Sequence, residues 1–407
     1  MKVLLIHQAF VSPQDAGGTR HLELARFART RGHDVAIVAS DLSYLSGKKH
    51  ADTRGLVSHQ DVEGIRVLRA YTYPSLHRSF VWRIVSFLSF MLTSVWAGLR
   101  AGPVDLVMGT SPPIFQAVSA WAVAFLRRKP FLLEIRDLWP DFAVDMGVLK
   151  NPVLIALSRW LEMFLYRRAT HILVNSPAYQ RIVVGKGIPA DKVSLIPNGV
   201  DPGMFDPNSD GADVRLKWAL KDSIVVLYAG ALGMANDIPS ILRAAAMTRD
   251  DPRIRWVFAG DGKERSKLEA LARELGVEGC TVFTGARPKA EMKGFMAAAD
   301  ICIATLQNIP MFKTTYPNKV FDYMAAGRPT VLGIDGVIRE VIEAAEGGIF
   351  VQPGSAEAIA RAVRSLAADP ELRRRQGNSA REYVARHFNR LDQAAQFVGL
   401  IERIDRR

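Results

Sequence analysis

Near its middle, the chain reads Asn198-Gly199-Val200-Asp201-Pro202-Gly203, a run that is dense in turn-forming residues. The sequence has 407 residues, which is more than one hydrophobic core usually supports, so two domains are expected from length alone. We therefore place the domain boundary at this run. The predicted domains are a first domain over 1–198, a second over 199–385, and a C-terminal helix over 386–407 that returns toward the first domain.

Short apolar runs alternate with helical patterns on both sides of this boundary. The runs predicted as strands are 3–6, 35–39, 106–108, 131–135, 172–174 and 194–196 in the first half, and 224–228, 255–259, 281–284, 301–304 and 330–333 in the second. Continuous apolar strands are typical of parallel sheets that are covered on both faces. The predicted fold class is α/β, with two doubly wound Rossmann-like domains whose ligand-binding strand ends face a cleft between them.

The composition is that of a soluble globular protein, with 49% hydrophobic and 23% charged residues. Its two cysteines, Cys280 and Cys302, have no partner at zinc spacing and fit a reducing cytosol. The apolar run 3–6 is too short for a secretory signal and is expected to form a buried strand. These features predict a cytoplasmic protein.

The net charge of +12 is unevenly distributed. Residues 1–200 contain 24 Lys and Arg against 14 Asp and Glu, whereas residues 201–407 contain 29 against 27. A basic first half favours an anionic partner there, such as a lipid surface, a lipid pyrophosphate or a nucleic acid; a generally basic composition without any partner is the alternative. No nucleic-acid recognition motif occurs, so no nucleic-acid partner is expected.

Three glycine-containing turns follow predicted strands. Their candidate ligand-binding residues are Gly17 and Gly18 in the first turn, Gly230, Gly233 and Asn236 in the second, and Gly260, Asp261 and Gly262 in the third. Glycine lets a backbone approach a ligand, and backbone N–H groups at strand-to-helix turns attract anions. The spacing fits neither a dinucleotide-binding fingerprint nor a P-loop, which disfavours a dehydrogenase or an NTPase. The turns predict backbone donors for a diphosphate, with purely structural tight turns as the alternative.

The most informative stretch is Tyr316-Pro317-Asn318-Lys319-Val320-Phe321-Asp322, which continues to Gly327 and Pro329. Pro317 is placed to begin a helix and Gly327 to end it. Lys319 and Asp322 are three residues apart and therefore share one helix face. The ammonium can neutralise a diphosphate near the helix N-terminus, and the carboxylate can accept hydrogen bonds from ribose hydroxyls. A surface ion pair between the two is the alternative.

The carboxylates are not arranged for a metal. No Asp-x-Asp sequence occurs, so we expect no essential metal and no cofactor beyond the substrate. Asp137, Asp141 and Asp145 are spaced four apart, and a solvated helix face is favoured over a metal site. His7 and His21 are interpreted as structural rather than catalytic histidines.

A set of motifs runs through almost the whole chain in order. They are Gly17-Gly18, Arg31-Gly32-His33-Asp34-Val35, Ile196-Pro197-Asn198-Gly199-Val200-Asp201, Ala259-Gly260-Asp261-Gly262, Pro317-Asn318-Lys319 and Ala326-Gly327-Arg328-Pro329. With them the sequence resembles the retaining glycosyltransferases of family 4, which have the two-domain GT-B fold. Through Glu134-Ile135-Arg136-Asp137-Leu138-Trp139-Pro140 and the loop 230–236, it also resembles a narrower group that builds bacterial surface polysaccharides.

The resemblance implies roles for individual residues. The first domain would face the acceptor, and the second would bind the nucleotide-sugar donor. Donor-binding residues would be Gly17, Gly18, Gly230, Gly233, Asn236, Gly260, Asp261, Gly262, Asn318, Lys319 and Asp322. Asp322 holds the second acidic position of the family's E-x7-E pattern, and Asp137 corresponds to the acid after its catalytic-loop histidine. The catalytic group would be Asp137, Arg136 and Lys319.

Three departures from the family pattern shift the expected chemistry. The first acidic position of E-x7-E is Thr314, the histidine position is Arg136, and the loop 230–236 lacks the Arg and Lys of many members. Lys319 therefore carries more of the positive charge directed at the diphosphate. Catalysis is expected to rest on stabilising the departing diphosphate and on positioning, without a strong general base.

Two apolar stretches in the basic half are candidates for membrane contact. Residues 84–99 contain no charge, are too few to span a bilayer reliably, and have Phe80, Trp82, Phe87, Phe90 and Trp96 in or beside them. The second stretch is 152–168. A core helix is the alternative for 84–99. We expect peripheral attachment to the inner face of an anionic membrane and a lipid-linked or glycan acceptor.

The predicted activity is a retaining, metal-independent transfer of a sugar from a UDP-sugar to that acceptor in cell-surface polysaccharide biosynthesis, lipopolysaccharide included. An N-acetylated hexosamine or a deoxy-hexosamine is the expected sugar. Two alternatives share the fold: a nucleotide-sugar 2-epimerase, and a non-catalytic scaffold suggested by Thr314 and Arg136.

Overall fold

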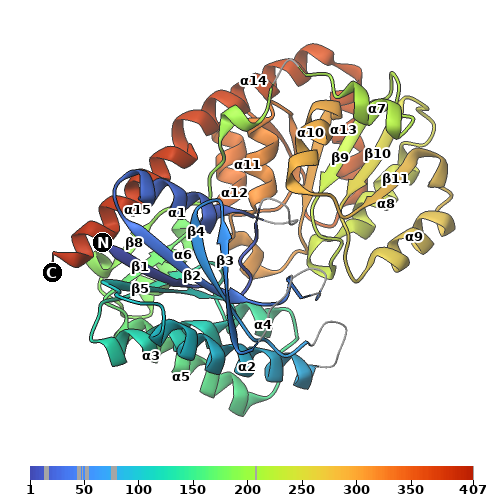
Figure 1. Cartoon of the computed structure of the whole chain (residues 1–407). Coiled ribbons are helices and arrows are strands. Elements are labelled where there is room, and N and C mark those ends of the chain that lie inside the picture. The colour runs from blue at the N-terminus through green and yellow to red at the C-terminus, as the bar shows by residue number, and fades with distance from the viewer. Residues whose placement is uncertain are drawn as a thin grey trace. The chain divides into compact units, whose positions relative to one another are not determined.

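A computed structural model describes residues 1–12, 18–43, 47, 49–50, 55–74, 80–206 and 209–406, without the side chains of residues 80 and 81 (Figure 1). The chain divides into two compact units. The first comprises Met1–Pro197 together with Leu391–Arg407, and the second comprises Asn198–Arg390. The sequence placed the boundary between residues 198 and 199 and the start of the returning segment at 386; in the structure the chain changes unit at 198 and at 391.

The first unit is built on an eight-stranded sheet with the order β3-β4-β2-β1-β5-β6-β7-β8. Its strands are β1 Lys2–Ile6, β2 Asp34–Ser40, β3 Val57–Val62, β4 Ile65–Ala70, β5 Leu106–Ser111, β6 Phe131–Ile135, β7 His171–Val174 and β8 Val193–Leu195. All neighbouring pairs are parallel except β3 with β4. The order reverses direction between β1 and β5, and in doubly wound sheets ligands bind outside the carboxyl ends of the strands at such a point.

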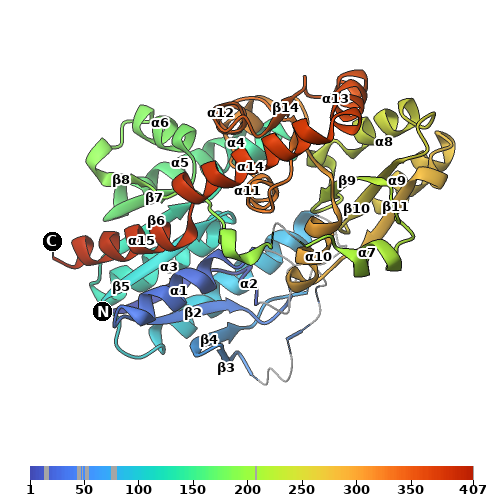
Figure 2. The same ribbon diagram turned by 90° about the horizontal axis from the view of Figure 1, so that it is seen from above.

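Helices cover both faces of this sheet. They are α1 Arg20–Thr30, α2 Phe80–Leu99, α3 Ile114–Arg127, α4 Asp141–Asp145, α5 Pro152–Arg168, α6 Pro177–Gly185 and α15 Arg390–Asp405. Leu22 of α1 and Phe397 and Ile401 of α15 share one buried core with the strands, while α2, α3 and α5 pack side by side on the other face (Figures 1 and 2). The C-terminal helix thus completes the core of the first unit.

The sequence did not predict the hairpin β3–β4. Its two-residue turn is Glu63-Gly64, and both residues have positive φ, 53° and 81°, as a type I′ turn requires. β3 is an edge strand, and most of its side chains are partly or fully exposed, so it lacks an apolar run. β4 was not predicted either, although five of its six residues are buried. Strand β14 (Gly348–Phe350), the other edge strand that the sequence did not predict, has three half-buried residues.

The second unit contains a six-stranded, all-parallel sheet with the order β11-β10-β9-β12-β13-β14. The remaining strands are β9 Ile224–Ala229, β10 Ile254–Ala259, β11 Thr281–Gly285, β12 Ile301–Thr305 and β13 Thr330–Gly333. The helices are α7 Ala212–Lys217, α8 Ile238–Met247, α9 Arg265–Glu274, α10 Met292–Ala298, α11 Asn318–Ala325, α12 Val337–Ala344, α13 Ala356–Ala368 and α14 Pro370–His387. This is the strand order of the dinucleotide-binding fold, with its reversal between β9 and β12. The prediction of two doubly wound α/β domains is confirmed.

Candidate functional site

In the second unit, Lys319 lies at the reversal point of the sheet. It is the second residue of α11, and its Nζ donates to Tyr228 Oη at 2.9 Å and to Asn236 Oδ1 at 2.7 Å. Tyr228 belongs to β9, and Asn236 ends the short 3-10 helix Met234–Asn236 that follows β9. Lys319 thus joins three elements that the sequence separates by about ninety residues.

The ammonium of Lys319 has only neutral partners in the described part of the second unit. No carboxylate lies within salt-bridge distance of its Nζ among those residues. Burial consequently lowers the pKa of Lys319 to about 7, because a desolvated cation without a counter-charge favours its neutral form. A bound anion would reverse that shift, so the position is suited to a negatively charged ligand.

The glycine turns around Lys319 are needed for space. Gly230 has a φ of 152°, and a Cβ there would lie 3.3 Å from both Lys319 Nζ and Tyr228 Oη. A Cβ on Gly260 would lie 1.8 Å from the carbonyl oxygen of Gly230, and a Cβ on Gly262 would lie 2.3 Å from that of Leu232. Gly260 and Gly262 are therefore required because the two loops pack backbone against backbone.

The other predicted donor-site residues of the second unit differ in their exposure and in the contacts that hold them. Asn318 is exposed at the start of α11, and Asp322 is half-buried one turn later. Asp261 is held by its own loop: it accepts from the Gly262 N–H at 2.8 Å and pairs with Arg265 at 3.2 Å. Gly233 has space for a Cβ, since the nearest atom is 3.9 Å away.

Thr314 occupies the position where the family pattern has its first acid. It ends the 3-10 helix Pro310–Thr314, and its hydroxyl donates to the Met311 carbonyl oxygen at 2.6 Å. At this position the chain therefore has a hydroxyl that is hydrogen-bonded within its own 3-10 helix, where the family pattern has a carboxylate. The structure thus gives Thr314 a local structural contact.

The first unit holds a buried cluster of charges at the carboxyl ends of its strands, centred on Glu134 of β6. The Glu134 side chain is fully buried; His21 Nε2 lies 2.6 Å from Oε2, and Arg20 Nε donates to Oε1 at 3.2 Å. Arg20 also donates to the carbonyl oxygens of Ile196 and Pro197. His7, directly after β1, stacks obliquely on His21 with ring centroids 4.2 Å apart.

The cluster sets the protonation of its members. Burial alone would raise the pKa of Glu134, but His21, Arg20 and Arg136 outweigh burial and hold that pKa well below its ordinary value. Burial lowers the pKa of His7, and its neighbours His21 and Arg136 lower it further. Burial also lowers the pKa of His21, against the opposing effect of Glu134. An ionised carboxylate therefore holds the buried cations, and the histidines stay neutral near pH 7.

Arg136 and Asp137 follow β6 at the same edge of the sheet. Arg136 Nη1 lies 3.4 Å from His7 Nε2, and His7 Nδ1 lies 2.8 Å from Thr110 Oγ1. Burial raises the pKa of Asp137 to about 6, although Arg136 and a hydrogen bond from Tyr179 act against that shift. Gly18 precedes α1, and Gly17 lies outside the described residues.

Sequence reasoning missed Glu134 and Arg20 as members of this cluster. It had also interpreted His7 and His21 separately, although their rings are in contact. The signal that could have found the cluster is Glu134 itself, a carboxylate within the otherwise apolar strand 131–135, because a buried charge needs partners.

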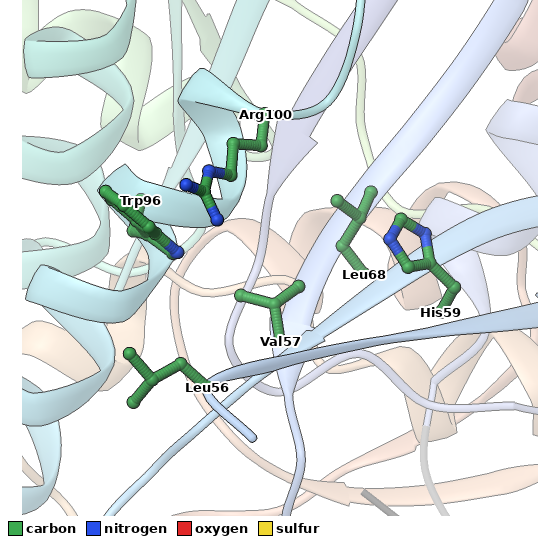
Figure 3. A pocket seen from close by; sticks show the side chains of 6 residues that line it. All are labelled: Leu56, Val57, His59, Leu68, Trp96 and Arg100. Atoms are coloured by element: carbon green, nitrogen blue, oxygen red, sulfur yellow. The ribbon is translucent and has the colours of Figure 1, made fainter. Parts of the chain in front are cut away.

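Two further features lie apart from both groups. Asp141 pairs with Lys186 at 3.0 Å and with Arg159 at 3.4 Å, and no group of three metal-ligating side chains occurs within the ranges that the structure describes. Figure 3 shows a cavity between the hairpin β3–β4 and α2. It is lined by Leu56, Val57, His59, Leu68, Trp96 and Arg100, so none of the predicted site residues lines it.

Comparisons with known proteins cover both units. Residues 16–199 match the family described as "Glycosyl transferase 4-like domain", and residues 213–383 match "Glycosyl transferases group 1". The sequence is 22% identical to a putative colanic acid biosynthesis glycosyl transferase, WcaI, of Escherichia coli (strain K12), over 97% of this chain and 98% of the relative.

Solved structures match over the full length as well. Anabaena HepE in complex with UDP and glucose matches with a TM-score of 0.75 at 18% identity, covering 99% of each chain. Sucrose-phosphate synthase from Thermosynechococcus elongatus matches with a TM-score of 0.76 at 20% identity, covering 99% of this chain and 98% of its own. At these identities the matches establish the fold, the two-domain GT-B fold expected from the sequence.

Proposed function

On the premise that the chain belongs to the family 4 glycosyltransferases of polysaccharide and glycoconjugate biosynthesis, we propose that it transfers a sugar from a UDP-sugar, with retention of configuration. The acceptor is lipid-linked or a glycan, and the reaction takes place on the cytoplasmic side of the membrane. The transferred sugar is an N-acetylated hexosamine or a deoxy-hexosamine. UDP is favoured because the structurally similar HepE was solved with UDP and glucose.

The observation that carries the proposal is the neutral environment of Lys319. Its ammonium is enclosed by Tyr228 and Asn236, and burial lowers its pKa to about 7. A diphosphate at this point supplies the missing counter-charge and restores the protonated form. The donor nucleotide would therefore place its phosphates at the reversal point between β9 and β12.

The same position supports leaving-group stabilisation without a metal. In the proposed transfer, the bond between the sugar C1 and the diphosphate oxygen breaks, and its electron pair goes to the diphosphate. The acceptor hydroxyl oxygen bonds to C1 on the same face, and its proton passes to the departing diphosphate. Lys319 and the N-terminus of α11 stabilise the charge that develops there, and Asp322 would accept hydrogen bonds from the ribose hydroxyls.

Arg136 and Asp137 are the proposed residues on the acceptor side. Asp137 has a pKa of about 6, so its carboxyl group changes charge near neutral pH. Arg136 Nη1 lies 3.4 Å from Nε2 of His7, whose pKa burial lowers well below its ordinary value. The pair can orient an acceptor hydroxyl through one cation and one titrating carboxyl group.

Thermal stabilisation of the purified protein by UDP, GDP, TDP and ADP, with and without magnesium, tests the proposal. We expect selective stabilisation by UDP that does not depend on magnesium and is lost in Lys319→Ala and in Asp322→Ala. The matched control is Lys267→Ala, which removes an exposed lysine paired with Glu264 and should keep the shift. The donor site would be wrong if no diphosphate stabilised the wild-type protein.

Product analysis then separates the transferase from the two alternatives. A 2-epimerase interconverts the nucleotide sugar without any acceptor, whereas the transferase hydrolyses it slowly or transfers the sugar. A non-catalytic scaffold binds UDP but neither hydrolyses the nucleotide sugar nor transfers the sugar. Thr314, which stands where the family has an acid, is the reason to test this alternative.

A further inference from the structure

The outer faces of α2, α3 and α5 carry a continuous set of exposed apolar side chains, here called the aromatic face. On α2, Leu88, Leu92, Trp96 and Leu99 follow helical spacing, with Leu92 68% exposed. The α3 contribution is Phe125 and Leu126, and the α5 contribution is Val153, Leu154, Leu157 and Trp160, with Trp160 64% exposed. All three helices lie on the same side of the first sheet (Figures 1 and 2).

Ring contacts connect the three helices into one surface. Phe87 of α2 stacks on Phe115 of α3, with ring centroids 6.0 Å apart. Trp121 of α3 meets Phe164 of α5 edge to face at 4.9 Å, and Phe164 stacks on Trp160 at 5.7 Å. Soluble monomers rarely expose apolar patches of this extent unless the patch binds something.

The borders of the aromatic face are basic. Arg83 belongs to α2 and Arg100 follows it, Arg127 ends α3 with Arg128 and Lys129 after it, and Arg159, Arg167 and Arg168 belong to α5. Two of these cations are paired with aspartates outside the three helices: Lys129 with Asp105 at 3.8 Å, and Arg159 with Asp141 at 3.4 Å. Within the same three helices the acidic residue is Glu162, which is buried and paired with Lys186 at 2.7 Å. Arg100 lies over the Trp96 ring at 3.6 Å, and Arg168 lies over Phe164 at 5.6 Å. Cations fixed beside aromatic rings are typical of surfaces that meet lipid headgroups.

We infer that the aromatic face inserts into the headgroup region of an anionic bilayer. Its apolar side chains would enter the acyl boundary, and its basic border would contact the lipid phosphates. A second copy of this chain is disfavoured as the partner, because two-fold pairing would bring like charges together. The choice of a membrane as the partner rests on the proposed function. Binding to vesicles in the absence of nucleotide tests the inference separately from the donor site.

Contacts between α2 and the rest of the first unit indicate that α2 lies along the membrane surface and does not cross the bilayer. One 18-residue window, Trp82–Leu99, is long and apolar enough to cross a bilayer, and 33% of it is buried. Its inner side is fixed to the domain: Thr93 Oγ1 donates to the Tyr71 carbonyl oxygen at 2.7 Å, and a Cβ on Gly98 would lie 2.8 Å from Val123. A spanning helix would have to give up these contacts.

The structure also corrects the list of aromatic side chains that the sequence offered. Phe90 is fully buried and packs inward. In contrast, α3 was not predicted to take part, and it supplies Phe125, which is 67% exposed. The lipid-facing surface is therefore three helices wide.

Sedimentation of the full chain with vesicles tests the inference. We expect binding to equimolar phosphatidylglycerol and phosphatidylcholine, weaker binding at high salt, and at least roughly tenfold weaker binding to phosphatidylcholine alone. The pair Leu157→Ser and Trp160→Ser should lower the affinity by at least about tenfold. Leu216→Ser is the matched control, because Leu216 is 84% exposed on α7 of the second unit, and it should bind like the wild type.

A charge series completes the experiment. Arg128→Glu with Arg167→Glu should reduce binding to anionic vesicles by at least about tenfold, whereas Arg361→Glu with Arg375→Glu on exposed positions of α13 and α14 should have a much smaller effect. The inference is overturned if the wild type does not sediment with anionic vesicles, if both pairs reduce binding equally, or if the serine variants bind unchanged. The serine variants should keep the thermal shift produced by UDP. A loss of vesicle binding in these variants then reflects the aromatic face and not the donor site.

Discussion

The two units treat desolvated charge in opposite ways: Glu134 is fully buried, whereas Lys319 is half-buried. In the first, Glu134 is surrounded by Arg20 and His21, and its pKa is held low because its neighbours favour the carboxylate. In the second, Lys319 donates to a hydroxyl and an amide oxygen, and burial lowers its pKa because these neutral partners do not offset the desolvation of the ammonium. The first arrangement supplies its own counter-charge, whereas the second pairs the ammonium with neutral oxygens alone among the described residues of its unit.

If the proposed function holds, this difference separates a charge that maintains the fold from one that binds the substrate. A buried ion pair that loses one member leaves the other charge uncompensated. A buried cation without a counter-charge already destabilises the folded state, so its removal has no such penalty. Substitution at the two positions should therefore change stability in opposite directions.

The largest expected effect is on stability in Glu134→Gln. The substitution leaves Arg20 and Arg136 without their buried carboxylate, which should lower the free energy of unfolding by about 3–5 kcal/mol. Urea titration measures the change. Glu371→Gln is the control, since that carboxylate is 72% exposed in its pair with Arg374 and should change stability by less than about 0.5 kcal/mol. Equal losses of stability in Glu134→Gln and Glu371→Gln would contradict the conclusion that the buried carboxylate of the first unit maintains the fold.

The next effect is on nucleotide affinity in Lys319→Met. Loss of a charge-assisted contact with the diphosphate should weaken UDP binding by roughly tenfold to a hundredfold, as measured by calorimetry. The unliganded variant should be at least as stable as the wild type, because a desolvated cation with only neutral partners has been removed. A strongly destabilised variant would instead mean that Lys319 maintains the fold as Glu134 does.

A smaller effect concerns pH. The pKa of Lys319 in the folded state is about 7, below that of an unfolded lysine near 10.4, so the unfolded chain binds more protons between these values. Stability of the unliganded protein should therefore rise with pH through this window, and the rise should be absent in Lys319→Met. Below the folded pKa the contribution is constant.

Nucleotide binding should reverse this titration. At pH 8 the bound diphosphate restores the ammonium, so binding should take up close to one proton (roughly 0.9). Calorimetry in buffers of different ionisation enthalpy measures the uptake. At pH 5.5 little uptake is expected, because Lys319 is already protonated. Proton release at pH 8 would contradict the assignment.

The smallest effect is expected for Gly230→Ala. The added Cβ would lie 3.3 Å from Lys319 Nζ and carries the strain of a φ of 152°, so UDP affinity should fall by a few-fold, on the order of 1 kcal/mol. Gly279→Ala is the control, since a Cβ there meets no atom within 4 Å. An unchanged affinity in Gly230→Ala would show that the ammonium is less confined than its distances suggest.

Local patterns in the sequence were sufficient for the fold class and for the helix that carries Lys319. Pro317 and Gly327 bracket α11 as expected, and the apolar strands were found because buried parallel strands are continuously hydrophobic. Pro317-Asn318-Lys319 is a contiguous motif, so one window of sequence contains the signal.

The remainder depended on contacts between distant segments. The Glu134 cluster draws on residues 7, 20, 21 and 136, which no local window contains together. Lys319 and Asp322 lie three residues apart on α11, as predicted, but the partners of the Lys319 ammonium, Tyr228 and Asn236, lie on other elements. Strand β3 of the hairpin is partly polar and at an edge, so it has no apolar run to recognise. Its neighbour β4 is mostly buried and was missed as well.

The backbone contact between the loops after β9 and β10 has a practical consequence for engineering. The carbonyl oxygens of Gly230 and Leu232 occupy the space that side chains at positions 260 and 262 would need. If one loop alone were replaced by that of a homologue, its backbone or side chains would clash with the other loop, whose conformation fits the original sequence. Attempts to retarget donor choice by grafting should therefore move both loops as one cassette, and evolution should have exchanged them together.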